Sequence, residues 1–458
     1  MSSSTSGSNL LVRDVALDGA RLDCRVVAGV VAELAAGLTP RPGEQVVDGA
    51  GGALLPGLHD HHVHAFAAAA AAGSLDLRGG ALPAQGQAAA PERAGVRDWV
   101  RAVGLGDDDA TAADLDRVWP SRPARVQHRS GALWVLNTRA IELLEGVLEP
   151  EERADGRVWR GDARLGEALG RLDPRGVEDD LRPWGEQLAA RGVTGLTDAT
   201  VGLEASGLAV VRAHLPQRVV SLGAEDDGLP VKVVAGDHGP VDGSDRWSEL
   251  VTAVRAARER GRPVAVHAVS AAALAMVLAV LDEVGVLPGD RVEHAAVCDD
   301  DAADRLAELG VTVVTQPSIA ARRGRAMVDA SEPEDRAWLW RIAGLRDRGV
   351  RVVLSSDAPY GDVDPWATIR LAAAGLPDDR SPWLRDQTIS AREALASYLT
   401  RPEDPAGAVR AVRPGAAADL CVLDAPLDVV LDRVTGGDTA SPVRLTVIDG
   451  QVVSTRPG

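Results

Sequence analysis

The chain has 458 residues, of which 45% are hydrophobic and 25% are charged, as in an average globular protein. This composition excludes disordered and collagen-like chains. The chain has 67 acidic and 49 basic residues, and its net charge of −18 disfavours binding to nucleic acid or to an anionic membrane. Cys24, Cys298 and Cys421 lie far apart without a CxxC motif, so we expect neither a disulfide framework nor a cysteine zinc site. The first residues have neither the positive nor the apolar region of a secretory signal, and we expect a cytoplasmic protein.

The two ends of the chain share a β-rich pattern. Residues 9–55 contain short alternating runs separated by Gly, Asp and Pro turns, and residues 418–424 and 443–450 repeat this pattern near the C-terminus. Such runs predict strands, and the two sets are able to pair with each other. We therefore expect residues 1–57 and 405–458 to form one small β-sandwich domain.

From residue 58 to residue 404, short β-branched runs alternate with helical segments, which is typical of βα units and a parallel sheet. Five strand candidates in the second half are VKVVAGD, PVAVHAV, RVEHAAV, VTVVTQP and VRVVLSSD, and the helical segments before the last four end near Gly261, Gly285, Gly310 and Gly349. Their spacing suits either a closed (β/α)8 barrel or a doubly wound sheet. The Ala/Gly-rich stretch 65–93 predicts a surface loop or an irregular insertion.

Four of the nine histidines lie in the run HDHHVH, residues 59–64, directly after an apolar run. On a strand, side chains two apart point to the same side, so His62 and His64 converge on one point, as a metal site requires. His59 and His61 then point to the opposite face. The spacing therefore favours a metal site over a polar loop that happens to be rich in histidine.

More candidates lie late in the predicted strands of the second half. His267, His294 and Asp357 each fall near the carboxyl end of a strand, where the catalytic groups of barrel enzymes gather. Lys232, the one lysine among the 49 basic residues, lies in the apolar run VKVV. A buried, unpaired ammonium is costly unless it is deprotonated or modified. Since arginine is the cation everywhere else, we infer that this position needs a primary amine.

In this order the residues resemble the amidohydrolase superfamily of metal-dependent hydrolases: PGLHDHHVH, a strand lysine, two strand histidines and a final SSDAP. The resemblance covers about residues 9–456. Within the superfamily, five segments are similar to the branch of the N-substituted formamide deformylases and their uncharacterised relatives. These segments are LDLRG at 75–79, HRSGALWVLNTRAI at 128–141, GVTGLTDAT at 192–200, RVEH at 291–294 and SSDAPYGDVDPW at 355–366.

The resemblance implies an α/β fold, a distorted (β/α)8 TIM barrel with a small β-sandwich domain formed by both chain ends. It implies two divalent metal ions, zinc first and iron, manganese or cobalt as alternatives, held by six residues. These are His62, His64, Lys232, His267, His294 and Asp357. Lys232 would carry a carbamate formed with CO2 that bridges both ions, and Asp357 would take a proton from the metal-bridging hydroxide or water and pass it to the leaving nitrogen. Glu293 or Asp60 could orient the imidazoles.

The implied activity is hydrolysis of a C–N bond in an amide, formamide, carbamate or cyclic amide. The residues that could contact the substrate are His128, Arg129, Asn137, His238 and Tyr360, with Arg129 and Asn137 equally suited to bracing a loop. Branch members often carry a histidine in the segment that begins at Gly131, where this chain has Ala132. We expect a small-molecule substrate and neither nucleic acid nor membrane as a partner, whereas the formation of a homo-oligomer stays open.

Two other functions compete with this interpretation. A mononuclear deaminase of a nucleobase-like ring shares the HxH motif, the two later histidines and the aspartate. It normally needs a glutamate three residues after the fifth-strand histidine, where this chain has Ser270, and it leaves Lys232 without a task. A non-catalytic scaffold on the same fold normally loses metal ligands, and all six are present here.

Overall fold

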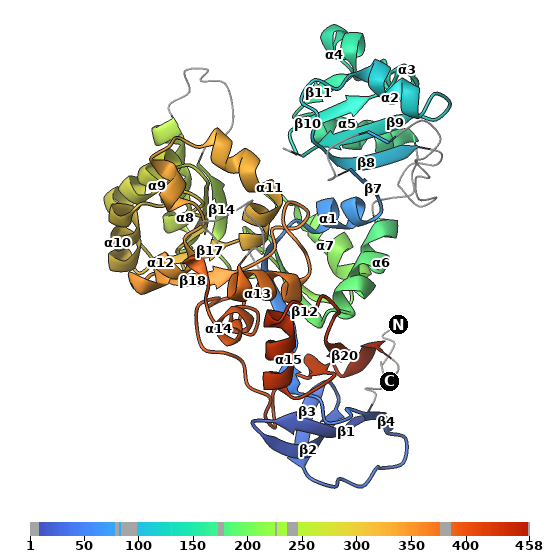
Figure 1. The fold of residues 1–458 in the computed structure, drawn as a ribbon, viewed down its shortest axis with the longest axis vertical. Coiled ribbons are helices and arrows are strands. Elements are labelled where there is room, and N and C mark those ends of the chain that lie inside the picture. The colour runs from blue at the N-terminus through green and yellow to red at the C-terminus, as the bar shows by residue number, and fades with distance from the viewer. Residues whose placement is uncertain are drawn as a thin grey trace. The chain divides into compact units, whose positions relative to one another are not determined.

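The computed structural model describes residues 9–77, 82–83, 99–129, 131–172, 178–224, 227–235, 246–375 and 386–456. The chain has a mixed α/β fold (Figure 1) and divides into two compact units. The first unit contains residues 1–64 and 186–458, and the second contains residues 65–185.

The centre of the first unit consists of parallel strands. A three-stranded sheet has the order β13-β12-β6, and a five-stranded sheet has the order β14-β15-β16-β17-β18. The strands are β6 (Leu58–Val63), β12 (Val193–Asp198), β13 (Arg218–Ser221), β14 (Val231–Val234), β15 (Val264–Ala268), β16 (Arg291–His294), β17 (Thr312–Thr315) and β18 (Arg351–Leu354). A parallel bridge between Val63 and Ala358 links β6 to the segment that follows β18. All five strands predicted in the second half of the chain are confirmed.

Helices connect these strands, because parallel neighbours need a crossover connection. They are α7 (Ala205–His214), α8 (Arg246–Glu259), α9 (Ala271–Val284), α10 (Asp300–Leu309), α11 (Pro317–Ala330) and α12 (Ile342–Asp347), with a 3-10 helix η1 (Asp335–Trp338). Three more helices, α13 (Pro365–Ala374), α14 (Ala391–Ala396) and α15 (Leu427–Thr435), follow the last parallel strand along the chain. Local signals mark their ends: the Ser270 side chain accepts a hydrogen bond from Ala273 N–H at the start of α9, and Gly310 ends α10 in the left-handed region at φ 65°.

Two four-stranded sheets contain the ends of the chain, with the orders β3-β2-β1-β4 and β21-β20-β19-β5. Their strands are β1 (Leu10–Leu17), β2 (Ala20–Val27), β3 (Val30–Ala35), β4 (Gln45–Asp48), β5 (Leu54–Pro56), β19 (Leu420–Leu423), β20 (Val443–Ile448) and β21 (Gln451–Thr455). β5 pairs antiparallel with β19, so the two ends share hydrogen bonds. One core cluster draws on both sheets, with Leu10, Val12 and Val26 from the first and Leu420 and Leu445 from the second.

The second unit contains a five-stranded sheet with the order β11-β10-β9-β8-β7. Its elements are α1 (Ala65–Ala72), β7 (Leu75–Asp76), β8 (Val100–Leu105), α2 (Ala112–Val118), β9 (Ala124–His128), β10 (Leu133–Leu136), α3 (Thr138–Leu143), α4 (Pro150–Asp155), β11 (Arg157–Trp159) and α5 (Asp162–Leu172), and α6 (Glu178–Ala189) leads back to the first unit. Residues 65–72 were expected in a surface loop or irregular insertion. They form α1 instead, because alanine has the highest helix propensity of all residues.

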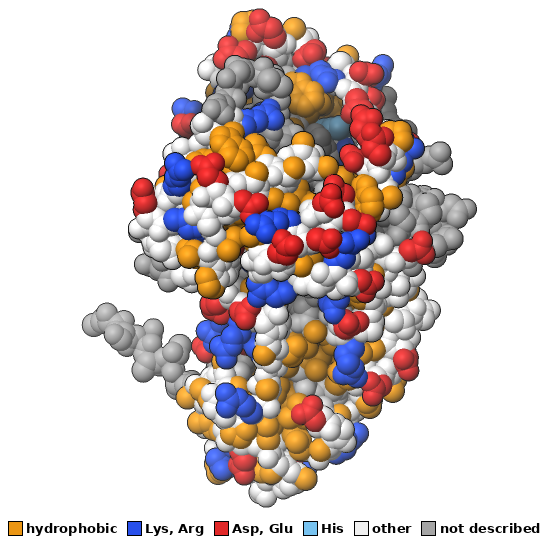
Figure 2. All heavy atoms as spheres, turned by 90° about the vertical axis from the view of Figure 1, so that its left-hand side faces the viewer, with side chains coloured by type: hydrophobic (Ala, Val, Ile, Leu, Met, Phe, Trp, Pro, Cys, Tyr) orange, Lys and Arg blue, Asp and Glu red, His pale blue; other side chains and the backbone are white. Residues whose placement is uncertain are grey.

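The surface carries charges of both signs. Figure 2 shows acidic and basic side chains interspersed over the face in view. Among the described residues, no helix is both long and apolar enough to cross a membrane.

Candidate metal centre

The HDHHVH run lies on β6 and just beyond it, and its side chains alternate between two faces. His59 Nε2 lies 2.8 Å from Thr197 Oγ1, and His61 Nε2 lies 2.9 Å from Thr400 Oγ1. His62 and His64 lie on the other face, where both approach Asp357. The structure therefore confirms the predicted alternation of the histidines.

The carboxyl ends of the other strands bring further candidates to this face. Lys232 on β14 has its Nζ 3.4 Å from His62 Nε2. The ring of His294, the last residue of β16, lies 5.2 Å from the ring of His62 and 4.5 Å from that of His267 on β15, centroid to centroid. The parallel register explains this grouping, because β15 aligns His267 with Glu293, the neighbour of His294.

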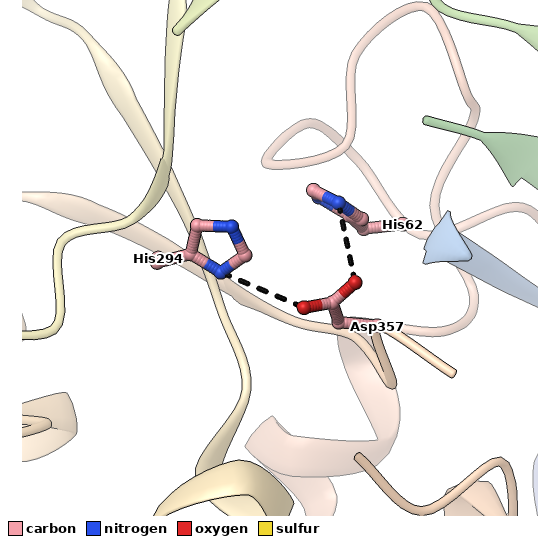
Figure 3. Close-up of side chains that lie close together, drawn as sticks. All are labelled: His62, His294 and Asp357. Carbon is pink, nitrogen blue, oxygen red and sulfur yellow. Dashed lines mark ion pairs between the residues drawn. The ribbon is translucent and has the colours of Figure 1, made fainter. Parts of the chain in front are cut away.

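Asp357 lies between His62 and His294 (Figure 3), and His64 approaches it as well. Its Oδ1 is 3.1 Å from His64 Nε2 and 3.6 Å from His62 Nε2, and its Oδ2 is 3.9 Å from His294 Nδ1. His62, His294 and Asp357 each offer one ligand atom, and these atoms lie within 4.8 Å of one another. The structure thus brings together all six residues that the sequence nominated as metal ligands.

The backbone at this face adopts a rare conformation. His294, Ala295 and Asp357 have φ values of 77°, 46° and 51°, in the left-handed region that non-glycine residues seldom occupy. The backbone N–H of Asp357 donates to the carbonyl of His62 over 2.8 Å, which ties the turn after β18 to β6. Strain of this kind persists where the surrounding structure enforces it, and it clusters at functional sites.

Burial keeps the imidazoles of His62 and His294 neutral. It lowers the pKa of His62 well below its ordinary value and lowers the pKa of His294 to about 4. Burial also lowers the pKa of the Lys232 ammonium, although the carboxylates of Glu293 and Asp357 oppose this shift. For Asp357 burial acts in the opposite direction, but the neighbouring imidazoles favour the ionised form and hold the pKa below its usual range. At neutral pH the site therefore offers the unprotonated imidazoles of His62 and His294 beside a carboxylate.

Each of three histidines has its Nδ1 next to a different polar group. The Nδ1 of His62 contacts the Glu293 carboxylate, the Nδ1 of His64 lies 3.2 Å from Thr200 Oγ1, and the Nδ1 of His294 lies 2.7 Å from Gln316 Oε1. Glu293 was one of two residues expected to orient imidazoles. The other, Asp60, contacts backbone instead, because its Oδ1 accepts from the N–H groups of His62 and Ser356, both over 3.2 Å. Burial raises the pKa of Asp60 to about 6.

Neither Thr200 nor Gln316 was predicted as a site residue. Gln316 directly follows β17, so it occupies the same strand-end position as the residues that were chosen, and this position could have identified it. Its Nε2 donates to the carbonyl of Val314 over 3.1 Å and to Ser355 Oγ over 3.0 Å, which turns Oε1 toward His294. Thr200 had no comparable signal, because it lies in a loop beyond β12.

Tyr360 lies beside the centre. Its ring meets the ring of His64 edge to face with centroids 5.8 Å apart, and about a third of its surface is exposed. This position is compatible with the substrate contact proposed for it. His238 lies outside the described residues.

The other three proposed substrate contacts belong to the second unit. His128 Nε2 lies 3.0 Å from Asp108 Oδ1, and Arg129 lies 4.0 Å from the same carboxylate. The Asn137 amide is fully engaged by backbone: Oδ1 accepts from two N–H groups, and Nδ2 donates to two carbonyls. Of the two roles expected for Asn137, the geometry supports bracing of a loop.

The donor set of the first unit fits divalent metal ions. Imidazole nitrogens and a carboxylate are ligands that zinc and its first-row neighbours accept. The buried Oδ1 of Asp357 makes no hydrogen bond, although two imidazole nitrogens lie within 3.6 Å of it. A buried carboxylate oxygen needs a partner, and a cation shared with these nitrogens would supply one.

The fold and this donor set agree with a family assignment. Residues 45–454 match the profile of the Amidohydrolase family. The chain therefore belongs to the Amidohydrolase family, which is a family of hydrolytic enzymes.

Two curated relatives are similar to parts of the chain. N-substituted formamide deformylase of Arthrobacter pascens is 30% identical over 172 residues, which are 37% of this chain and 31% of that protein. The putative amidohydrolase YtcJ of Bacillus subtilis is 32% identical over 123 residues, which are 26% of this chain and 23% of that protein. The matched segments thus span about a third or less of either relative.

Solved structures share the fold over nearly the whole chain. An uncharacterized metal-dependent hydrolase from Pyrococcus horikoshii has a TM-score of 0.70 at 20% identity, covering 94% of this chain and 100% of that one. N-isopropylammelide isopropylaminohydrolase from Burkholderia multivorans has a TM-score of 0.53 at 18% identity, covering 98% of both chains.

Proposed function

We propose that the protein is a metal-dependent hydrolase that cleaves a C–N bond in an amide, formamide, carbamate or cyclic amide. The observation that carries this proposal is the convergence of histidines, Lys232 and Asp357 at the carboxyl ends of β6, β14, β15, β16 and the turn after β18. The proposed ligands are His62, His64, Lys232, His267, His294 and Asp357. Two divalent ions, zinc first among the candidates, are the proposed cofactor.

In this proposal Lys232 carries a carbamate. The neutral Nζ attacks CO2, a new N–C bond forms, and the nitrogen loses one proton, so that an amine becomes an anionic carbamate with two oxygen donors. The lowered pKa of the ammonium supports this step, because only the unprotonated amine is a nucleophile. Arginine would not supply such an amine, which gives a reason for a lone lysine at this position.

Asp357 is the proposed general acid and base. When bound, divalent ions lower the pKa of water and polarise a carbonyl group. The ionised Asp357 carboxylate then takes a proton from the attacking water and delivers it to the nitrogen that leaves. Its position beside His62, His64 and His294 supports this role, because one oxygen approaches two imidazoles and the other approaches the third.

For the fold, we propose that the eight parallel strands close into a distorted (β/α)8 barrel over residues 58–404. The link between β6 and the segment after β18 supports closure. We further propose that residues 1–57 and 405–458 form a β-sandwich, which the core cluster shared by the end sheets supports.

The choice of a C–N bond rests on the relatives. The deformylase of Arthrobacter pascens acts, by its name, on N-substituted formamides, and its matched segment is 30% identical to this chain. Ser270 adds support against a deaminase, because the structure uses this residue as the N-cap of α9 rather than as an acid or base.

The test is a screen of N-formyl amines, N-acyl amines, carbamates and cyclic amides, with release of the amine measured by mass spectrometry. We expect turnover that is lost on chelation and restored by zinc, with a His294→Asn variant as the inactive control. Metal-independent turnover, or turnover unchanged in the His294→Asn variant, would contradict the proposal.

A further inference from the structure

A charged triad lies behind the candidate metal centre. Glu293 is fully buried, with one carboxylate oxygen against His62 Nδ1 and the other 2.5 Å from Arg291 Nε. Arg291 is itself 2% exposed and donates from a terminal nitrogen to the carbonyl of His61 over 3.1 Å. The triad Arg291, Glu293 and His62 thus joins β16 to β6 by charge and hydrogen bonds.

Folding alone does not account for this triad. Removing two charges from water is costly, and well-packed apolar residues in place of a buried ion pair are often neutral or stabilising. The Glu293 carboxylate nevertheless lies against the Nδ1 of His62, while the Nε2 of the same ring faces Lys232 and Asp357. A buried carboxylate in this position points to a function in the site.

The carboxylate determines which nitrogen of His62 can bind a metal. An ionised carboxylate only accepts hydrogen bonds, so the proton of the neutral imidazole resides on Nδ1. The lone pair then resides on Nε2, and this atom faces Lys232 Nζ at 3.4 Å and Asp357 Oδ1 at 3.6 Å. The other carboxylate oxygen faces Arg291 Nε at 2.5 Å, and a guanidinium has no acceptor atom.

We propose that Glu293, held by Arg291, is a positioning residue that fixes His62 as an Nε2 donor and strengthens its bond to a metal ion. Thr200 and Gln316 do the same for His64 and His294, but they are neutral acceptors. An anionic acceptor makes an imidazole a stronger donor than a hydroxyl or an amide does. Glu293 therefore contributes more to metal affinity than Thr200 or Gln316. The inference rests on the proposed metal centre.

The test compares Glu293→Gln with Thr200→Val, Gln316→Ala and a matched control. The control is Asp290→Asn, because Asp290 is also buried, directly precedes β16 and pairs with Arg258 over 2.6 Å. Co2+ affinity and the Co2+ absorption spectrum are measured for each protein. The tautomer of His62 is read from 15N chemical shifts of the metal-free protein.

We expect Glu293→Gln to weaken Co2+ binding about 10- to 100-fold and to populate the other tautomer of His62. Smaller losses are expected for Thr200→Val and Gln316→Ala, and none for Asp290→Asn. Unchanged affinity and tautomer in Glu293→Gln, or an equal loss in Asp290→Asn, would overturn the proposal.

A second variant covers the case in which Glu293→Gln does not fold. Arg291→Lys keeps the positive charge but removes the contact from Nε to Glu293. We expect this variant to weaken Co2+ binding as well, although by less than Glu293→Gln does. Unchanged Co2+ binding in Arg291→Lys would overturn the proposal. If the proposed metal centre is wrong, the result differs from a failure of this inference, because the wild type itself would then bind no Co2+. The 15N chemical shifts would still show whether Glu293 fixes the tautomer of His62.

Discussion

The identity of residue 232 as lysine indicates which chemical group this position needs. Forty-eight of the 49 basic residues are arginine, so a cation alone does not explain a lysine here. The structure places its amine 3.4 Å from a histidine of the candidate centre. Burial lowers the pKa of this amine, which favours the nucleophilic form that a carbamate needs.

Asp357 is predicted to be essential for turnover but not for folding. In Asp357→Asn we expect kcat to fall about 10²- to 10⁴-fold, because the amide cannot move the proton that a general acid and base moves. The matched control is Asp362→Asn, which changes a carboxylate on the same loop. Steady-state kinetics on a substrate from the screen give the result, and less than a tenfold loss in kcat would contradict the assigned role.

His59 gives a pH-dependent prediction. Burial, with help from Arg410 and Arg291, lowers its pKa to about 3, whereas an unfolded histidine titrates near 6.5. Between these values the unfolded chain binds one more proton than the folded chain, so the free energy of unfolding falls as the pH falls. In His59→Gln the slope of the free energy of unfolding against pH should shrink by about 1.4 kcal/mol per pH unit between pH 6 and pH 4. Urea unfolding of both proteins across this pH range measures the two slopes. Parallel plots of unfolding free energy against pH would refute the prediction.

At the scale of residues, the sequence predicted the six proposed ligands and Glu293 as an orienting residue, but it did not predict Thr200 or Gln316. His62, His64, Lys232, His267, His294 and Asp357 carry a recognisable order along the chain. Thr200 could not be predicted, because a loop residue acquires a partner only through three-dimensional folding. Asn137 had two expected roles, and only its four backbone contacts favoured bracing.

Among the elements, strands were easier to predict than backbone conformations. Apolar β-branched runs that end at a polar residue predicted β14 to β18, and the parallel register then gathers those polar ends on one face. No local sequence pattern predicts the positive φ of His294 or Asp357, because tertiary contacts impose this conformation. Helix α1 was missed because a run of alanines was taken as low complexity rather than as strong helix propensity.

Close packing between β6 and β12 gives a prediction for a glycine. A Cβ on Gly195 would lie 2.4 Å from His59 Nδ1, and Gly195 pairs with His59 in the parallel register. Gly195→Ala must therefore displace β6, and we expect a loss of stability of about 1–3 kcal/mol. Weaker metal binding should accompany it, because β6 carries His62. An unchanged urea midpoint would show that β6 tolerates the methyl group.

For the whole molecule, the sequence indicated that both ends of the chain resemble each other, and the structure adds that they share one core. It did not indicate that residues 65–185 form a compact unit of their own. Their short strands are mixed with helices in the same alternation as the rest of the chain, so periodicity offered no boundary. Which residues pack together is a long-range property that a one-dimensional pattern does not contain.

The shared core predicts the effect of a truncation. Removing residues 405–458 takes away Leu420, Val422, Leu445 and Val447 from the cluster that also contains Leu10 and Val12. Each fully buried side chain contributes about 1.5–3 kcal/mol, so the combined loss is comparable with the whole stability of a domain. We expect no cooperative thermal transition by circular dichroism, and recovery of that transition when residues 405–458 are supplied as a separate chain. Cooperative unfolding of the truncated protein alone would contradict a common core.

The proposed function depends on a carbamate-bridged binuclear centre, and its decisive test is metal content measured together with carbamate detection. Protein prepared with zinc and 13C-labelled bicarbonate is compared with Lys232→Arg by elemental analysis and 13C NMR. Because Lys232 is the only lysine, a side-chain carbamate signal has one source. We expect about two metal ions per chain and one carbamate resonance in the wild type, with both sharply reduced in Lys232→Arg. One ion or fewer per chain, no carbamate resonance and an unchanged metal content in the variant would contradict it.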